Sequence, residues 1–144
     1  MELVLFIGIP GSGKSTFYSR NFLNTHVRIN RDMLRTETRE KILIEACLRA
    51  KQPFVLDNTN VTREKRAAYI AQARATQFRV IGYFFDCPVD IALERNGQRV
   101  GKAKVPNVAI FSMAKKLEVP ELGEGFEELF RVKNDFTIEP IATS

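Results

Sequence analysis

The chain has 144 residues, 44% hydrophobic and 27% charged, a composition typical of one soluble domain, residues 1–144, with a single core. It contains no apolar stretch near the roughly 20 residues that a membrane helix needs, and a strand starting by residue 2 leaves no space for a secretory signal peptide. We therefore expect a cytoplasmic protein without a membrane partner. The net charge of +5 weakly favours a polyanionic partner, and one histidine is too few for a histidine-cluster metal site.

The first predicted element is a buried strand over residues 2–7, followed by GIPGSGKS at residues 8–15, a complete match to the phosphate-binding loop pattern G-x-x-x-x-G-K-[ST]. Its glycines let successive backbone N–H groups face phosphate oxygens, and a helix over residues 14–24 turns its N-terminus to the same phosphates. The alternative, an unrelated glycine-rich turn, does not account for this strand and helix. We expect ATP and Mg²⁺ here, with contacts from Gly11, Ser12, Gly13, Lys14, Ser15 and Thr16.

The rest of the chain alternates between strand and helix patterns. The predicted elements are a strand over 27–30, a helix over 32–51, a strand over 53–56, a helix over 63–76 capped by Thr62, a strand over 78–85, helices over 88–98 and 106–117, and a last strand within 129–138. This alternation predicts an α/β fold, a parallel sheet with helices on both faces. For a domain that resembles others with this phosphate-binding loop, we expect five strands in the order 2-3-1-4-5 and a small lid.

Polar residues follow three of these strands, and in an open α/β sheet ligands bind at the carboxyl ends of the strands. Asp57 ends an apolar strand, which suggests a place beside Mg²⁺; a turn or capping role is the alternative, because residues 57–60 (DNTN) are rich in turn formers. Asp32 is our candidate for the base that accepts a hydroxyl proton. Judged by spacing alone, a helix-capping role for Asp32 is the stronger reading.

Two arginines four residues apart, Arg95 and Arg99, share a helix face and lead into a basic stretch over 100–104. A basic flap there would neutralise charge on a transferring phosphoryl group and exclude water. A solvated helix end, favourable to the helix dipole, accounts for these charges equally well. The glutamates between 118 and 128 are expected to form a solvated face without chemistry.

Four blocks, residues 8–16, 29–35 (INRDMLR), 57–60 and 95–99 (RNGQR), together resemble the P-loop polynucleotide 5′-hydroxyl kinase family, in the order found in the phage enzyme and in the mammalian polynucleotide kinase-phosphatase. The segment between the second and third blocks is shorter than in the phage enzyme. None of the four blocks belongs to a phosphatase, so we do not expect 3′-end processing.

The resemblance implies a role for each matching residue. Lys14 and Ser15 would hold the ATP phosphates and Mg²⁺, and Asp32 would activate the 5′-hydroxyl. Arg35 matches the phage arginine that engages the acceptor's phosphate, where the mammalian form differs. Arg99 matches the lid arginine at the β- and γ-phosphates, and Arg95 would pack on the adenine.

The leading hypothesis is therefore an ATP-dependent kinase acting on the 5′-hydroxyl end of DNA or RNA. A kinase for a nucleoside, sugar or antibiotic hydroxyl, and an ATP-switched binding module without transfer activity, remain as alternatives. A polynucleotide acceptor should bind with a steep salt dependence, whereas a neutral small acceptor should not. The sequence leaves open the choice between DNA and RNA and the oligomeric state.

Overall fold

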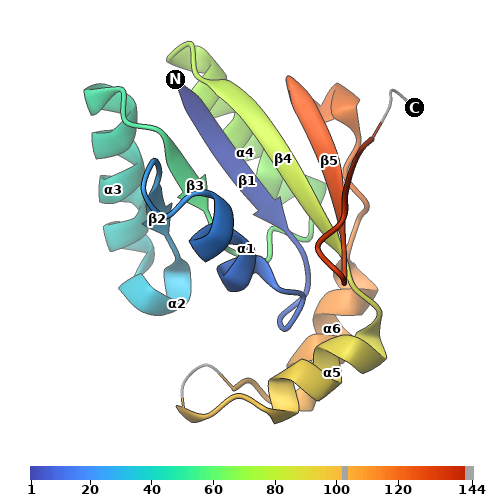
Figure 1. Cartoon of the computed structure of the whole chain (residues 1–144). Coiled ribbons are helices and arrows are strands. Elements are labelled where there is room, and N and C mark those ends of the chain that lie inside the picture. The colour runs from blue at the N-terminus through green and yellow to red at the C-terminus, as the bar shows by residue number, and fades with distance from the viewer. Residues whose placement is uncertain (102–103, 142–144) are drawn as a thin grey trace.

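The computed structural model describes residues 1–101 and 104–141. The elements alternate as the sequence predicts (Figure 1). In chain order they are β1 (Glu2–Ile7), α1 (Lys14–Asn21), β2 (Val27–Ile29), α2 (Arg31–Leu34), α3 (Glu37–Ala50), β3 (Phe54–Leu56), α4 (Arg63–Ala75), β4 (Arg79–Asp86), α5 (Val89–Gly97), α6 (Asn107–Lys116), the 3₁₀ helix η2 (Leu122–Glu124), β5 (Glu128–Lys133) and β6 (Ile138–Pro140).

The strands form one sheet in the order β2-β3-β1-β4-β5-β6. The first five are parallel and stand in the predicted order, so the α/β prediction is confirmed. The sixth strand was missed: β6 pairs antiparallel with β5, with Val132 opposite Ile138. A three-residue strand carries no measurable alternation, and its position here depends on the turn in which the Lys133 N–H bonds to the Thr137 carbonyl at 2.9 Å.

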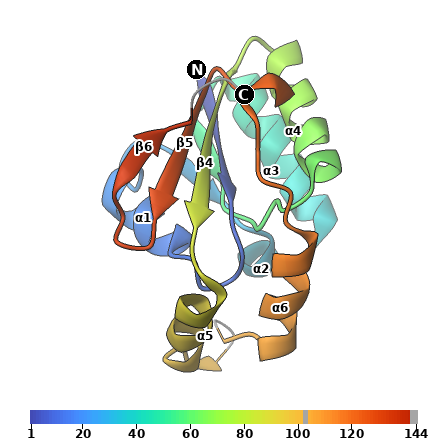
Figure 2. The same cartoon turned by 90° about the vertical axis from the view of Figure 1, so that its right-hand side faces the viewer.

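The alternating side chains of the central strand divide the core into two layers. Leu3, Leu5 and Ile7 of β1 face α3 and α4, which cover one side of the sheet (Figure 2). Val4 and Phe6 face α1 on the opposite side. Burial on both faces explains the unbroken apolar run of this strand. The residues of α5 and α6 lie beyond the carboxyl ends of β1 and β4, where the small lid was expected.

The helix predicted over residues 32–51 is two helices. The backbone of Arg35 has φ 77°, which ends α2, and the Thr36 hydroxyl then accepts a hydrogen bond from the Arg39 N–H at 3.2 Å to cap α3. The buried face of α3 is also displaced from the apolar positions in the sequence. Glu40 is buried while Ile42 is 58% exposed, because tertiary packing decides which side of a weakly amphipathic helix meets the core.

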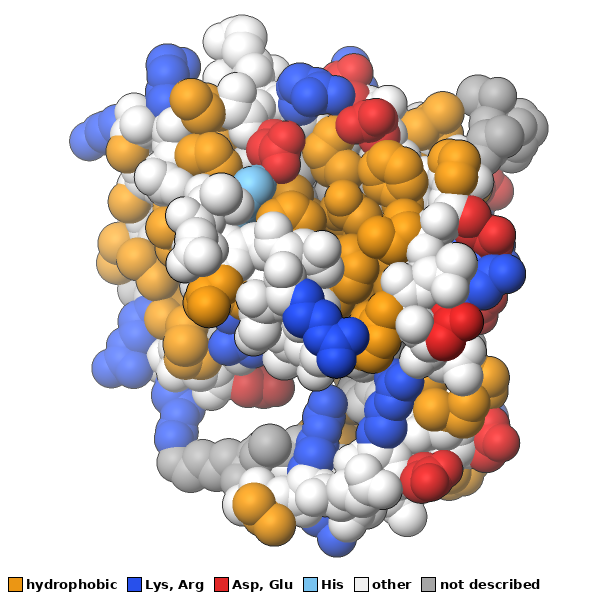
Figure 3. Space-filling model, in the orientation of Figure 1, with side chains coloured by type: hydrophobic (Ala, Val, Ile, Leu, Met, Phe, Trp, Pro, Cys, Tyr) orange, Lys and Arg blue, Asp and Glu red, His pale blue; other side chains and the backbone are white. Residues whose placement is uncertain are grey.

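No helix among the residues that the structure describes is long and apolar enough to cross a lipid bilayer. The space-filling view shows a hollow between the end of the sheet and the α5 segment, with Lys and Arg side chains projecting around it (Figure 3). The hollow lies where the carboxyl ends of the strands meet the lid, which is the edge where the sequence places the polar residues.

Candidate active site

The phosphate-binding loop lies between β1 and α1, and two of its glycines have positive φ: 82° at Gly11 and 98° at Gly13. A Cβ atom on Gly11 would come within 2.6 Å of the Ala92 carbonyl oxygen of α5, so no larger residue fits there. The Ser12 hydroxyl is buried and has no hydrogen-bond partner among the described residues. A curled backbone with an unpaired buried hydroxyl fits an anionic phosphate group.

Lys14 begins α1, and its ammonium closes over this loop. Its Nζ donates to the carbonyl oxygens of Gly8 and Ile9 at 3.0 and 2.9 Å. Burial, the largest effect, lowers the pKa of Lys14 to about 8. The negative charges of Asp57 and Asp32 act to raise this pKa, whereas the positive charge of Arg99 acts to lower it. Asp57, Arg99 and Asp32, all predicted site residues, therefore lie close enough to the Lys14 ammonium to shift its pKa.

This pKa predicts a pH-dependent nucleotide affinity. A phosphate anion beside Lys14 favours the ammonium, so its pKa is higher in the complex than about 8 in the free protein. Affinity is then greatest below pH 8 and weakens above it by up to about 1.4 kcal/mol per pH unit. Calorimetric titration with an ATP analogue at pH 7, 8 and 9 measures this slope. Lys14→Met should bind more weakly and without the slope; an unchanged slope in that variant would exclude Lys14 as its source.

A cavity of about 1240 Å³ extends along this edge of the sheet. The predicted site residues that line it are Gly11, Lys14, Ser15, Thr16, Asp32, Arg35, Asp57 and Arg99. Ser12, Gly13 and Arg95 are not in its wall. The structure thus brings the phosphate loop, the α2 residues, the end of β3 and the lid arginine to one space, although they are distant in sequence.

Asp57 follows β3 and is only 2% exposed. Its Oδ2 accepts a hydrogen bond from Arg28 Nε at 2.7 Å, and Arg28 Nη2 donates to the Ser15 hydroxyl at 3.2 Å. The capping role considered for Asp57 is wrong, because Thr62 caps α4 by accepting from the Lys65 N–H. One guanidinium reaches both the carboxylate and the hydroxyl, so one cation is able to contact both.

The donors at this point fit Mg²⁺ by their chemistry, since carboxylate and hydroxyl oxygens are ligands that Mg²⁺ accepts. In the described part of the chain, no group of three or more His, Cys, Asp or Glu side chains is placed to hold a metal ion. An ion held by Ser15 and Asp57 would therefore complete its coordination with phosphate oxygens and water, as Mg²⁺ commonly does in phosphoryl-transfer sites.

Asp32 is the second residue of α2, and its helix-capping reading is wrong. The cap is Asn30, whose Oδ1 accepts from the Met33 N–H at 2.9 Å while its amide donates to the Asp57 carbonyl. The carboxylate of Asp32 is exposed and lines the large cavity, together with a second cavity of about 290 Å³. Arg35 borders both cavities. Their roles toward an acceptor stay predictions.

A buried carboxylate that sequence reasoning missed holds α2 in place. Glu40 of α3, 2% exposed, accepts two hydrogen bonds from Arg31 at 3.1 and 3.2 Å, one from Tyr69 at 2.7 Å and one from Asn58 at 3.0 Å. Burial opposes ionisation, but these hydrogen bonds hold the pKa of Glu40 below its usual value. Its partners come from three other parts of the chain, so no local pattern could have revealed them.

The two lid arginines lie differently. Arg99 follows α5 and lines the large cavity. Arg95 instead ties α5 to the phosphate loop: its guanidinium donates to the Gly11 carbonyl at 3.4 Å and to the Asn134 carbonyl at 2.6 Å, 5.7 Å from the centre of the Phe136 ring. Its contact with adenine stays a prediction. Part of the basic stretch, residues 102–103, lies outside the described residues.

Sequence comparison with known proteins gives a family match and a curated relative. A family model described as an AAA domain matches residues 35–120. A curated relative, the bifunctional polynucleotide phosphatase/kinase of Schizosaccharomyces pombe, is 29% identical over 136 residues, covering 91% of this chain and 33% of its own length. The chain thus spans about a third of that relative's length. The sequence match confirms the resemblance to polynucleotide kinases.

Solved structures share the fold. Kti12 of Chaetomium thermophilum, in complex with ADP-AlF3, superimposes with a TM-score of 0.69 at 17% identity, over 91% of this chain and 88% of that one. A gluconokinase from Sinorhizobium meliloti 1021 gives 0.60 at 17% identity, over 92% and 82%. These likenesses establish the P-loop kinase fold for the chain.

Proposed function

This chain belongs to the AAA domain family, whose model matches residues 35–120, and from that premise we propose that it is an ATP-dependent kinase for the 5′-hydroxyl of a nucleic acid end. We further propose that residues 1–144 act as one kinase domain. The observation that carries the proposal is the cavity in which Asp32 meets the phosphate loop and Arg99. The name of the Schizosaccharomyces pombe relative supports the choice of acceptor.

The proposed transfer needs little covalent help from the protein. The loop and Lys14 would hold the triphosphate, which supplies the phosphoryl group, and Mg²⁺ held by Ser15 and Asp57 would offset part of the triphosphate's negative charge. The acceptor oxygen forms a bond to the γ-phosphorus as the bond to the β–γ bridging oxygen breaks, and the hydroxyl proton passes to the carboxylate of Asp32. Arg99 stabilises the charge that develops on the transferring group.

The charge of the cavity favours a polynucleotide over a neutral small acceptor. Its 1240 Å³ exceed the roughly 300–1,000 Å³ of a site for one small ligand, which leaves room for an acceptor beside ATP. Beyond Asp32 the cavity continues between α3 and α4, where its walls include Lys41, Ile44, Lys65, Tyr69 and Gln72. A space for more than one nucleotide with cationic walls suits an acceptor that carries several phosphates.

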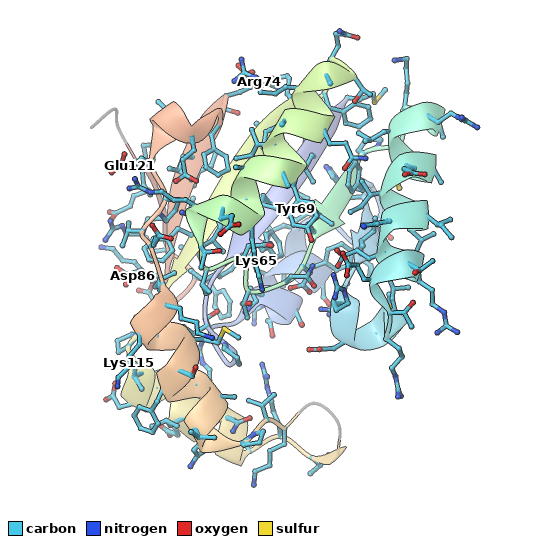
Figure 4. The ribbon with its side chains drawn as sticks, turned by 180° about the vertical axis from the view of Figure 1, so that it is seen from behind. Lys65, Tyr69, Arg74, Asp86, Lys115 and Glu121 are labelled. Carbon is cyan, nitrogen blue, oxygen red and sulfur yellow. The ribbon has the colours of Figure 1, made fainter. Side chains whose placement is uncertain are left out.

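Lys65 is the cation best placed to meet such phosphates. It lies at the start of α4, with Tyr69 one turn further along the same helix (Figure 4). Lys41 is paired with Glu37 at 3.4 Å, whereas the ammonium of Lys65 has neither an ion pair nor a hydrogen bond among residues 1–101 and 104–141. We therefore expect Lys65 to contact a phosphate downstream of the acceptor hydroxyl.

Transfer from γ-labelled ATP to 5′-hydroxyl oligonucleotides and to free nucleosides, over a range of salt concentrations, tests this function. With wild-type protein we expect transfer to oligonucleotides, with KM rising steeply with salt. Lys65→Gln should raise the oligonucleotide KM several-fold and lower the salt slope by about 0.7, the value for one single-strand phosphate contact. Lys115→Gln is the matched control, because that exposed lysine lies on α6 outside the cavity.

Three results would count against this proposal. Transfer to nucleosides or sugars but not to oligonucleotides would make the chain a small-molecule kinase. Nucleotide binding with slow hydrolysis and no labelled acceptor would make it a switch. Equal salt slopes for wild type and Lys65→Gln, with oligonucleotides phosphorylated, would exclude the proposed phosphate contact.

A further inference from the structure

A protein cation already occupies the position between the two side chains proposed for Mg²⁺. Arg28 is the middle residue of the edge strand β2, and its side chain reaches across to the phosphate-loop helix. Its Nε lies 2.7 Å from Asp57 Oδ2 and its Nη2 lies 3.2 Å from Ser15 Oγ. The guanidinium therefore bridges the same pair of oxygens that a metal ion would share.

The charge balance at this position admits one cation easily and two only at a cost. Asp57 is 2% exposed, and a buried carboxylate without a partner is strongly destabilising. Arg28 provides the compensating charge in the protein without nucleotide. A Mg²⁺ ion would need these oxygens at about 2.0–2.1 Å, too short to keep the Arg28 nitrogens bound to the same atoms. Like charges a few ångströms apart would also repel each other.

The surroundings of Arg28 allow its side chain to withdraw. The side chain is 28% exposed and lines the large cavity, so solvent and phosphate groups have access to it. Its guanidinium carbon lies 6.0 Å from the centre of the Tyr18 ring, a cation–π partner independent of Asp57. A triphosphate brings both the missing metal ligands and an anion to which the guanidinium can turn.

From this geometry we infer that Arg28 acts as a displaceable cation that keeps Mg²⁺ out of the Ser15–Asp57 position until a nucleotide arrives. The inference rests on the metal role proposed for these two residues. It makes metal binding conditional on nucleotide binding, because the free metal ion must compete with a tethered guanidinium, whereas the metal–nucleotide complex has phosphate ligands of its own. Arg28 then controls only the binding of the metal ion and takes no part in the chemical step.

Binding of Mn²⁺ as a spectroscopic substitute for Mg²⁺ tests this without any transfer reaction. Free Mn²⁺ is counted by electron paramagnetic resonance in titrations of nucleotide-free protein. We expect Arg28→Gln to bind Mn²⁺ at least tenfold more tightly than wild type, and the difference to shrink when a non-hydrolysable ATP analogue is present. Arg79→Gln, which changes an exposed arginine paired with Glu128 on the surface, should behave as wild type.

A second variant and a second measurement cover the case in which Arg28→Gln folds poorly. Arg28→Lys keeps one positive charge but cannot bridge two oxygens in a fork, so its Mn²⁺ affinity should lie between those of Gln and wild type. In thermal melting without nucleotide, Mg²⁺ should raise the midpoint of Arg28→Gln and leave that of wild type unchanged.

The possible outcomes distinguish the inference about Arg28 from the metal role proposed for Ser15 and Asp57 and from the proposed kinase activity. Equal Mn²⁺ affinity of nucleotide-free wild type, Arg28→Gln and Arg28→Lys would overturn it, even if Mn²⁺ binds normally with the analogue. If Asp57→Asn with the analogue binds Mn²⁺ as tightly as wild type, the metal role itself is wrong and the inference falls with it. Neither result touches the oligonucleotide assay, which tests the kinase proposal separately.

Discussion

Asp32→Asn is expected to lower the rate of phosphoryl transfer by about 10²–10⁴-fold while leaving ATP affinity unchanged. The amide keeps the shape of the side chain but cannot accept the hydroxyl proton. Asn30 caps α2, the helix that contains Asp32, and Thr36 caps α3. Because no hydrogen bond of the Asp32 carboxylate is found among the described residues, the substitution should not disturb the fold. The effect should therefore fall on kcat.

The measurement pairs single-turnover transfer from γ-labelled ATP with nucleotide binding by calorimetry. Asp90→Asn is the matched control, an exposed aspartate in the first turn of α5 outside the cavity. Normal turnover of Asp32→Asn would show that the base assignment is wrong. A loss of ATP affinity equal to the loss of rate would instead place Asp32 in nucleotide binding.

Arg99→Ala is expected to have the larger effect, about 10³–10⁵-fold on the chemical step, by analogy with arginines that contact the transferring phosphoryl group. Arg99 lines the cavity and its charge lowers the pKa of Lys14, so its guanidinium lies near the ammonium that closes over the phosphate loop. Without Arg99, the charge that develops on the transferring phosphoryl group is stabilised only by Lys14, the phosphate loop and Mg²⁺.

Single-turnover rates at saturating acceptor separate this effect from a change in binding. Arg49→Ala, in the last turn of α3, removes an exposed arginine from outside the cavity and should leave the rate unchanged. Arg99→Lys should recover part of the rate, because it restores the charge but not the fork of donors. If Arg99→Ala only raised KM for the acceptor, the lid role would be wrong.

Local patterns carried most of the fold. The phosphate loop is recognisable from consecutive residues because its backbone needs glycine at Gly11 and Gly13 and a lysine directly after them. The five parallel strands are apolar runs between helical segments, and the handedness of their connections restricts the sheet to few orders. The choice of 2-3-1-4-5 among these orders was implied by the resemblance to other domains with this phosphate-binding loop, not by the strand patterns themselves.

Predictions failed where packing between distant segments overrides a local pattern. The glutamates after residue 117 were expected to be solvated and inert, but Glu124 holds Arg66 Nε at 2.8 Å, and that arginine is fully buried. In α4 Ala67 and Ala71 are exposed, while Ile70 and Ala73 meet the core. Small side chains give a helix little preference for one face.

By itself the sequence determined the phosphate loop, the parallel strands and the two carboxylates that follow them, because each depends on neighbours in the chain. Only the tertiary structure decided which oppositely charged side chains lie next to each other. It places Arg28 between Ser15 and Asp57, and it buries Glu40 beneath Arg31. The free energy of a buried charge depends on which groups lie within a few ångströms of it. Those neighbours are brought there by the packing of strands and helices that are far apart in sequence.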